Sequence, residues 1–159
     1  MLNSRARKSI KQDFHEAFPL DNFTGQIRYI NHHLAHMASA FYTSPYENAA
    51  IVSVDGFGDF SSGCWGVGKG NNIKINGSVY YPHSLGVFYQ AITQLIGFPN
   101  YGDEYKVMGL APYGKPKYLT EMKRIVLLQK DGSYRLDLKY FVFHKKKVSY
   151  EWDNCTPFV

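Results

Sequence analysis

The stretch NHHLAH, at residues 31–36, gives the strongest indication of the fold and the function of this chain. It contains three of the chain's six histidines. In a helix, side chains four positions apart lie on the same face, so His32 and His36 would lie one turn apart. His33 would point about 100° away from His32. Two imidazoles one turn apart can bind one divalent ion from one side, which makes His32 and His36 candidate metal ligands.

Asp55 is the candidate third ligand. The apolar run at residues 49–54 predicts a buried strand, and Asp55 ends this run just before Gly56 and Gly58. A carboxylate in that position is a poor core residue and a good ligand. Histidine pairs at this spacing are more often surface or core residues than ligands. The DGFGD turn that begins at Asp55 raises the weight of the ligand interpretation. A structural role and a metal-binding role of the two histidines are then about equally well supported.

Periodicity and turn residues predict the remaining elements. Ser44-Pro45 ends the histidine helix, because the residue before a proline disfavours helical backbone. Ser84 is a candidate N-cap, with Gly97 just past the end of its helix. The predicted helices span 5–13, 32–42, 85–96 and 117–130. The predicted strands span 25–30, 49–54, 63–68 and 73–81, with one or two more within 134–148. The strands at 63–68 and 73–81 are expected to form a hairpin around residues 70–72, because glycine and asparagine tolerate the positive φ of tight turns. The sequence therefore predicts an α/β fold.

The composition indicates a single folded domain. The chain has 159 residues, of which 45% are hydrophobic and 16% aromatic, enough for a hydrophobic core. No apolar run approaches the ~20 residues that span a bilayer, and no apolar segment of a signal peptide follows the basic N-terminus. Cys64 and Cys155 lie far apart, as is typical of reduced cytosolic thiols. We expect a cytoplasmic protein with no membrane partner.

The net charge of +5 comes from the flanks of the chain. Residues 1–13 carry four basic and one acidic side chain, and residues 115–147 carry ten and three. Residues 14–114, which contain every motif, carry four basic and seven acidic side chains. Lysines interleaved with apolar residues are more typical of a solvated face than of a nucleic-acid site. The charge pattern therefore argues against nucleic acid as a partner.

Four blocks of this sequence resemble the O-carbamoyltransferase family, which includes nodulation and antibiotic-tailoring enzymes. The blocks occur in the family's order and at fitting intervals. They are HHLAHMASAFYTSPY (32–46), VDGFG (54–58), PHSLG (82–86) and EYKVMGLAPYG (104–114). The resemblance extends over most of this chain but over only part of the family's longer chain.

The resemblance implies a fold and a reaction. Family members join a Kae1-like domain of actin-like ATPase (ASKHA) fold to a YrdC-like domain. The YrdC-like domain makes carbamoyl-adenylate from carbamoyl phosphate and ATP. The Kae1-like domain transfers the carbamoyl group to a hydroxyl of a sugar-containing or natural-product acceptor. Residues 1–159 are then expected to form part of a Kae1-like domain, with a mixed sheet and packed helices.

The resemblance also implies a metal cofactor. The Kae1-like domain holds a divalent metal ion, often iron, near the nucleotide phosphates. In this chain His32, His36 and Asp55 fall on its ligand positions. The fourth protein ligand of the family lies further along than residue 159.

Further residues are expected to contact the nucleotide or to take part in catalysis. Gly56, Gly58 and Lys106 are the expected contacts of ATP or carbamoyl-adenylate, because glycines let a backbone approach a phosphate closely. Glu104 and Lys106 are the expected catalytic residues. In an extended strand the two would project to the same face, and each would favour the charged form of the other.

Much of the family's chain has no counterpart in residues 1–159. The opening strands, the rest of the Kae1-like domain and the YrdC-like domain are all unmatched. We therefore expect a carbamoyltransferase fragment that is inactive by itself, because catalysis by positioning fails when most positioning groups are missing. Two alternatives stay open: a non-catalytic metal- or nucleotide-binding remnant, and a Kae1-type relative that modifies tRNA. The block at 104–114 favours carbamoyl transfer.

Overall fold

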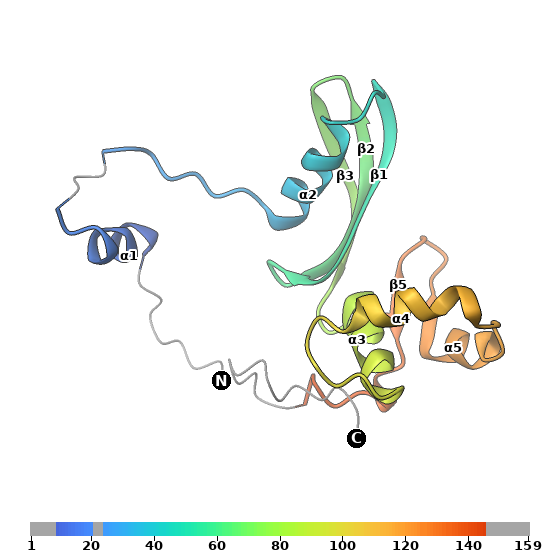
Figure 1. Ribbon diagram of the computed structural model, residues 1–159. Coiled ribbons are helices and arrows are strands. Elements are labelled where there is room, and N and C mark those ends of the chain that lie inside the picture. Colours follow the sequence, from blue (N-terminus) through green and yellow to red (C-terminus); the bar gives the residue numbers. More distant parts are fainter. Residues whose placement is uncertain (1–8, 21–23, 146–159) are drawn as a thin grey trace.

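The structure is a computed structural model that describes residues 9–20 and 24–145 (Figure 1). One helix packs on a three-stranded sheet, and the following helices with a small hairpin form a second group. No helix in these ranges is long and apolar enough to cross a membrane. The elements are α1 (Ile10–Ala17), α2 (His32–Phe41), β1 (Asn48–Gly58), β2 (Ser61–Lys69), β3 (Asn72–Tyr80), α3 (Leu85–Leu95), α4 (Glu104–Leu110), η1 (Ala111–Tyr113), α5 (Leu119–Ile125), β4 (Val126–Leu128), β5 (Tyr134–Leu136) and η2 (Leu138–Tyr140).

Helix α2 forms where the histidine run predicts it. The helix begins after Asn31, whose side-chain oxygen accepts a hydrogen bond from the Leu34 N–H at 2.9 Å. This contact satisfies an N–H that has no partner inside the helix. The buried residues of α2 are His33, Met37 and Phe41, which lie four positions apart and so share one face. That face packs against the sheet.

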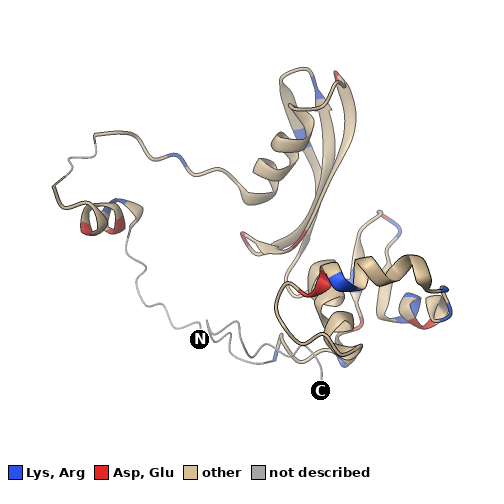
Figure 2. Cartoon of the chain, viewed as in Figure 1, with Lys and Arg blue, Asp and Glu red and all other residues tan. Residues whose placement is uncertain are grey.

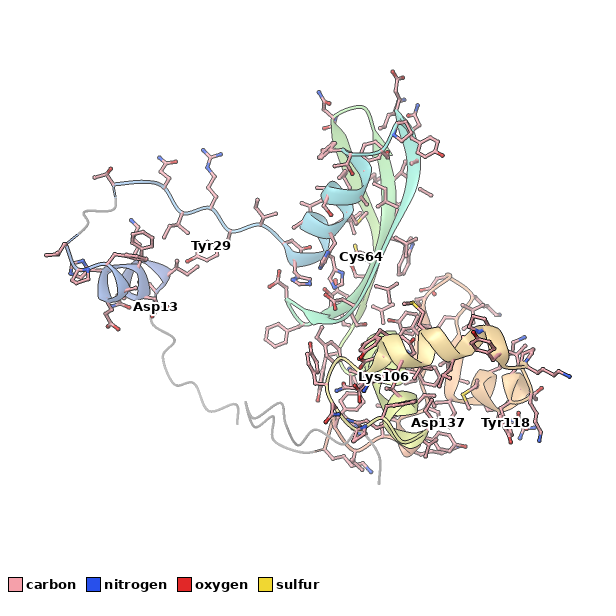
Figure 3. All side chains as sticks on the ribbon, in the orientation of Figure 1. Asp13, Tyr29, Cys64, Lys106, Tyr118 and Asp137 are labelled. Atoms are coloured by element: carbon pink, nitrogen blue, oxygen red, sulfur yellow. The ribbon has the colours of Figure 1, made fainter. Side chains whose placement is uncertain are left out.

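The main hydrophobic core lies between α2 and the sheet. Its buried residues are Met37, Phe41, Ile51 and Cys64. Burial of an apolar side chain of this size contributes about 1.5–3 kcal/mol, so this small cluster fixes the helix on the sheet. Cys64, labelled in Figure 3, is buried as a free thiol, whereas Cys155 lies outside the described residues.

The larger sheet has the strand order β1-β2-β3, and neighbouring strands are antiparallel. The predicted hairpin is confirmed, and its turn includes Gly70 with a φ of +54°, a conformation that glycine adopts readily. The predicted α/β class is confirmed in its combination of helices and strands. The expected mixed sheet is not found in the described residues, because β4 and β5 are also antiparallel.

Strand β1 is half-buried, which corrects the prediction of a buried strand. Ile51 and Ser53 point toward α2 and are each 6% exposed. Val52 and Val54 point to the opposite face and are 69% and 53% exposed. The continuous apolar run predicted burial of both faces. In the described structure only the face under α2 is well covered.

Two other predicted elements differ near the N-terminus. Residues 25–30 form no strand, because no described strand lies beside them to pair with their backbone. The helix expected at 5–13 is replaced by α1, which begins after Ser9 and ends at Ala17. Ser9 and Gln12 form a reciprocal capping box that starts α1 at this point. Residues 1–8 lie outside the described ranges.

The elements near the C-terminus are shorter than predicted. The helix expected at 117–130 ends at Ile125, where the chain passes directly into β4. The strand expected within 134–148 is reduced to β5, because its only described partner is the three-residue β4. Lys146 and Lys147 of the basic flank lie outside the described residues.

Helix α3 organises the second group. Ser84 is its N-cap and accepts a hydrogen bond from the Val87 N–H at 3.1 Å. Gly97 follows the end of the helix with a φ of +100°, so both predicted ends are confirmed. The buried hydrophobic residues of this group are Ala91, Leu136 and Phe141. Helix α3 therefore packs against the segment that follows β5.

His83 has a structural role in this group. Its Nδ1 accepts a hydrogen bond from the Leu136 N–H at 3.2 Å. Burial, and then the positive charges of Arg135 and His144, lower the pKa of His83 below its ordinary value of 6.5. An unfolded chain therefore binds a proton at this histidine at a higher pH than the folded chain does. The stability that neutral His83 contributes is present above about pH 6.5 and is lost as the pH falls through the folded pKa.

We therefore expect the free energy of unfolding to decrease as the pH falls from about 7.5 to about 5.5. The measurement is urea unfolding at several pH values. His83→Asn is the matched variant, because its side-chain oxygen can still accept the Leu136 N–H but does not titrate. A smaller pH dependence is expected in this variant. Equal pH dependence in both proteins would show that His83 is not the group responsible.

Candidate metal centre

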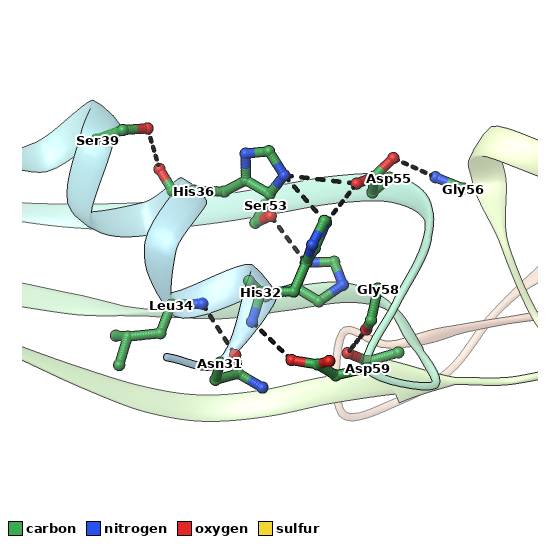
Figure 4. A network of polar contacts seen from close by, with 12 residues as sticks. Asn31, His32, Leu34, His36, Ser39, Ser53, Asp55, Gly56, Gly58 and Asp59 are labelled. Atoms are coloured by element: carbon green, nitrogen blue, oxygen red, sulfur yellow. Dashed lines mark hydrogen bonds and ion pairs between the residues drawn. The ribbon is translucent and has the colours of Figure 1, made fainter. Parts of the chain in front are cut away.

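His32 and His36 lie one turn apart on α2, and both face Asp55 on β1 (Figure 4). His32 Nε2 lies 2.7 Å from Asp55 Oδ2. His36 Nε2 lies 3.5 Å from the same oxygen and 3.1 Å from His32 Nε2. The fold thus brings together the three residues that the sequence singled out as candidate ligands. We refer to His32, His36 and Asp55 as the His–His–Asp cluster.

The geometry of this cluster fits a bound divalent cation. Donor atoms that each lie ~2.1 Å from one ion are ~3.0–3.4 Å apart at right or tetrahedral angles. The three observed separations bracket this range: 3.1 Å lies within it, and 2.7 and 3.5 Å lie just below and just above it. The side chains of His32 and Asp55 are each 38% exposed and that of His36 is 54% exposed, so further coordination positions are open. Two imidazoles and one carboxylate are typical ligands of zinc or non-haem iron(II).

Local charge also favours a cation here. Burial alone would raise the pKa of Asp55, but hydrogen bonds from His32 and the Gly56 N–H, with the charges of both histidines, hold it below 3.8. Asp55 is therefore ionised at neutral pH, as a metal ligand must be. Figure 2 shows acidic residues on the β1–β2 turn at this end of the sheet. In the strand register, Lys69 lies opposite Asn48 and Lys74 lies opposite Val67, both away from this turn.

His33 lies outside the cluster, as its position on the helix predicted. It is 1% exposed, and its Nδ1 lies 2.8 Å from the Ser53 hydroxyl of β1. Its Nε2 is buried without a hydrogen-bond partner in the described structure. His33 therefore fixes α2 against β1 two residues before Asp55.

Asp59 has a role that the sequence analysis did not predict. Its Oδ2 accepts a hydrogen bond from the backbone N–H of His32 at 2.8 Å. A carboxylate at a helix N-terminus is stabilised by unpaired N–H groups and the helix dipole. Asp59 thus anchors the first residue of α2, which is also a candidate ligand. The available signal was a second acidic residue four positions after Asp55 in the same DGFGD turn.

The two predicted nucleotide-binding glycines have different surroundings. A Cβ on Gly58 would lie 2.0 Å from His32 Cδ2 and 2.2 Å from His32 Cγ, so the absence of a side chain leaves room for that imidazole. A Cβ on Gly56 would have no atom within 4 Å. Gly58 thus has a structural contact within the cluster. Nucleotide binding by either glycine stays a prediction.

Glu104 and Lys106 lie on α4 rather than on a strand. Glu, Lys, Met and Leu are strong helix formers, and residues two apart on a helix point ~200° apart. The two side chains therefore do not share the face that an extended strand would have given them. In the described residues no hydrogen bond or ion pair joins either side chain to the His–His–Asp cluster. Figure 1 shows α4 beside α3 and away from α2.

Lys106, labelled in Figure 3, has a different partner. Its Nζ lies 2.7 Å from Asp103 Oδ1. This contact lowers the pKa of Asp103 and raises the pKa of Lys106. Both side chains are therefore charged at neutral pH.

A sequence model of the family described as "Carbamoyltransferase N-terminus" matches residues 16–151. The chain belongs to this family. The match includes the His–His–Asp cluster and the blocks at 82–86 and 104–114, so the resemblance inferred from these blocks is confirmed.

Relatives of this carbamoyltransferase-family chain include two nodulation proteins. The chain is 40% identical over 114 residues to NolNO of Sinorhizobium fredii, covering 71% of the chain and 17% of that protein. It is 42% identical over 110 residues to NolO of Bradyrhizobium diazoefficiens, covering 69% and 20%. An uncharacterised protein of Synechocystis is 42% identical over 111 residues, covering 69% and 18%. The chain spans about a fifth of the length of these curated relatives.

Proposed function

We propose that this chain supplies the metal-binding part of a carbamoyltransferase. One observation carries the proposal: the blocks that place the chain in the family include three residues whose ligand atoms lie within 4.8 Å of one another. In the whole protein, the carbamoyl group passes from carbamoyl-adenylate, made from carbamoyl phosphate and ATP, to a hydroxyl of a sugar-containing or natural-product acceptor. These substrates follow from the family resemblance.

The cluster residues bind and orient the cofactor. His32 and His36 offer Nε2 atoms, and α2 holds both in place because its adjoining face of His33, Met37 and Phe41 is buried against the sheet. Asp55 offers Oδ2, while its Oδ1 accepts the Gly56 N–H at 2.6 Å. This second contact keeps the carboxylate in one orientation. When bound, a divalent ion, iron in our proposal, would supply Lewis-acid stabilisation of charge on the nucleotide phosphate.

Transfer itself needs groups beyond the cluster. The acceptor oxygen forms a bond to the carbamoyl carbon, the bond from that carbon to the phosphate oxygen breaks, AMP leaves, and a base takes the hydroxyl proton.

Glu104 and Lys106 are the proposed catalytic residues, and Lys106, Gly56 and Gly58 are the proposed nucleotide contacts. The Lys106 side chain is 36% exposed. Its ammonium could therefore exchange the Asp103 carboxylate for a phosphate.

The fold proposed for the whole domain is the actin-like ATPase (ASKHA, Kae1-like) fold. Residues 1–159 would form part of it, with the antiparallel sheet β1-β2-β3 followed directly by α3. The order of these elements supports the proposal, and the family match is consistent with it.

The test is a chimera with a full-length relative whose carbamoyl transfer can be measured. The matching segment of that relative is replaced by the corresponding residues of this chain. Mass spectrometry then detects an acceptor that has gained one carbamoyl group. We expect product from the chimera and none from the 159-residue chain alone, because positioning groups are missing from the latter. Asp55→Ala in the chimera should abolish the product.

Three outcomes would contradict this proposal in different ways. Product from the short chain alone would mean that the missing segments are dispensable. Product from the chimera with Asp55→Ala would exclude the cluster from the reaction. A folded, metal-loaded chimera without activity would favour a non-catalytic metal-binding remnant.

A further inference from the structure

The PHSLG block at residues 82–86 has no part in the function proposed above. Within it, Ser84 is fully buried, at 0% exposed. Its hydroxyl oxygen accepts the Val87 N–H at 3.1 Å and so caps α3. The same hydroxyl donates to the Gly56 carbonyl at 2.6 Å and lies 3.2 Å from the Asp55 carbonyl. Ser84 therefore joins the start of α3 to the segment that carries a candidate metal ligand.

Gly86 contacts the same segment. A Cβ on Gly86 would lie 2.6 Å from Gly56 N, 2.7 Å from Asp55 O and 2.8 Å from Asp55 C. All three atoms belong to the peptide unit between Asp55 and Gly56. Backbone atoms cannot rotate away as the end of a side chain can, so the first turn of α3 and this peptide fit together only if residue 86 is glycine.

Strand pairing does not fix this peptide unit. Strand β1 pairs with β2 at Val54–Gly63 and again at Gly58–Ser61, and the register shifts between these two points. Residues 55–57 therefore lie in an irregular part of the ladder. Buried carbonyl groups there need other hydrogen-bond donors. Ser84 provides one.

The orientation of the peptide unit sets the orientation of the Asp55 carboxylate. The Gly56 N–H, which belongs to this unit, donates to Asp55 Oδ1 at 2.6 Å, and Oδ2 is left to face His32 at 2.7 Å. We propose that Ser84 and Gly86 are positioning residues that orient Asp55 for metal binding. This inference rests on the proposed metal centre. It explains why the block at 82–86 accompanies the ligand blocks in this chain.

The test compares Gly86→Ala and Ser84→Ala with two control variants of the same chain. Ser84→Thr keeps the hydroxyl and should rescue what Ser84→Ala loses. Gly109→Ala places the same methyl group on α4, where a Cβ meets no atom within 4 Å. Each protein is titrated with Co²⁺, whose visible absorption spectrum reports its coordination. Urea unfolding without metal gives the folded fraction of each variant.

We expect Gly86→Ala and Ser84→Ala to weaken Co²⁺ binding by the folded protein at least about tenfold, as loss of other outer-shell partners does. The spectrum of bound Co²⁺ should also change, because the carboxylate is displaced. Ser84→Thr and Gly109→Ala should bind like the unchanged chain. A residue that only stabilised α3 would lower the folded fraction without altering the spectrum.

Unchanged affinity and spectrum in both test variants would overturn the inference while leaving the metal centre intact. Loss of binding only in proportion to the unfolded fraction would overturn it as well. If the unchanged chain bound no Co²⁺, the proposed metal centre itself would be wrong, and the inference would fall with it. Co²⁺ binding by the unchanged chain therefore distinguishes a failure of the positioning inference from a failure of the proposed metal centre.

Discussion

Asp55→Asn is expected to weaken binding of a divalent transition metal by about a hundredfold or more, since even loss of an outer-shell partner costs ~10–100-fold. The substitution keeps the size of the side chain but removes the negative charge that faces both histidines. His32→Ala and His36→Ala should have similar effects, because each removes one of three converging ligand atoms. Binding is measured by titration with Zn²⁺ against a coloured chelator and by elemental analysis of the purified protein.

Asp59→Asn is the matched control for this experiment. It removes the same charge from the same turn, but its amide oxygen can still accept the His32 N–H. His33→Asn is the control for the histidines, because the Asn amide can still reach the Ser53 hydroxyl that His33 Nδ1 contacts. Both variants should retain most of the affinity. Equal losses in Asp55→Asn and Asp59→Asn would indicate a general effect of charge and contradict the assignment of ligands.

The local pattern of the sequence was sufficient to predict α2, the β2–β3 hairpin and α3. Each is determined by neighbouring residues: the cap Asn31, the turn at Gly70, and Ser84 with Gly97 at the two ends of α3. The i to i+4 spacing likewise placed His32 and His36 on one face. These predictions depend on contacts within a few residues, which periodicity and capping describe well.

Predictions that depended on distant partners were less successful. The apolar run at 49–54 predicted burial on both faces, yet burial depends on which elements pack there, and Val52 stays exposed. Residues 25–30 alternate like a strand but have no described strand beside them. Glu104 and Lys106 would share a face only in an extended strand, whereas their local sequence favours a helix. In each case tertiary contacts or helix propensity outweighed the hydrophobic pattern.

The contacts that Asp59, Ser84 and Gly86 make with the segments carrying His32 and Asp55 could not be predicted from spacing. Asp59 contacts His32 across 27 residues, and Ser84 contacts Gly56 across 28. Such contacts form only when the β1–β2 turn, α2 and α3 meet. The sequence marked all three residues as members of motifs, and the structure shows what each of them touches.

Gly58→Ala is expected to reduce metal affinity at least about tenfold, although it changes no ligand. The new methyl group would occupy the space of the His32 imidazole, whose Cγ and Cδ2 lie 2.2 and 2.0 Å from the Cβ position. The ring must rotate away, and its Nε2 then loses the 2.7 Å approach to Asp55 Oδ2. Metal titration of both proteins measures the loss, and the Co²⁺ spectrum shows whether one nitrogen ligand has been lost.

Gly56→Ala is the matched control, because it adds the same methyl group two residues away, where no atom lies within 4 Å. Its metal affinity should match that of the unchanged chain. The pair also separates two roles of the DGFGD turn. If the backbone at Gly56 approaches a phosphate, Gly56→Ala should weaken nucleotide binding while leaving metal binding intact. Equal metal affinity in Gly58→Ala and Gly56→Ala would mean that His32 does not bind the ion from the position it has in this structure.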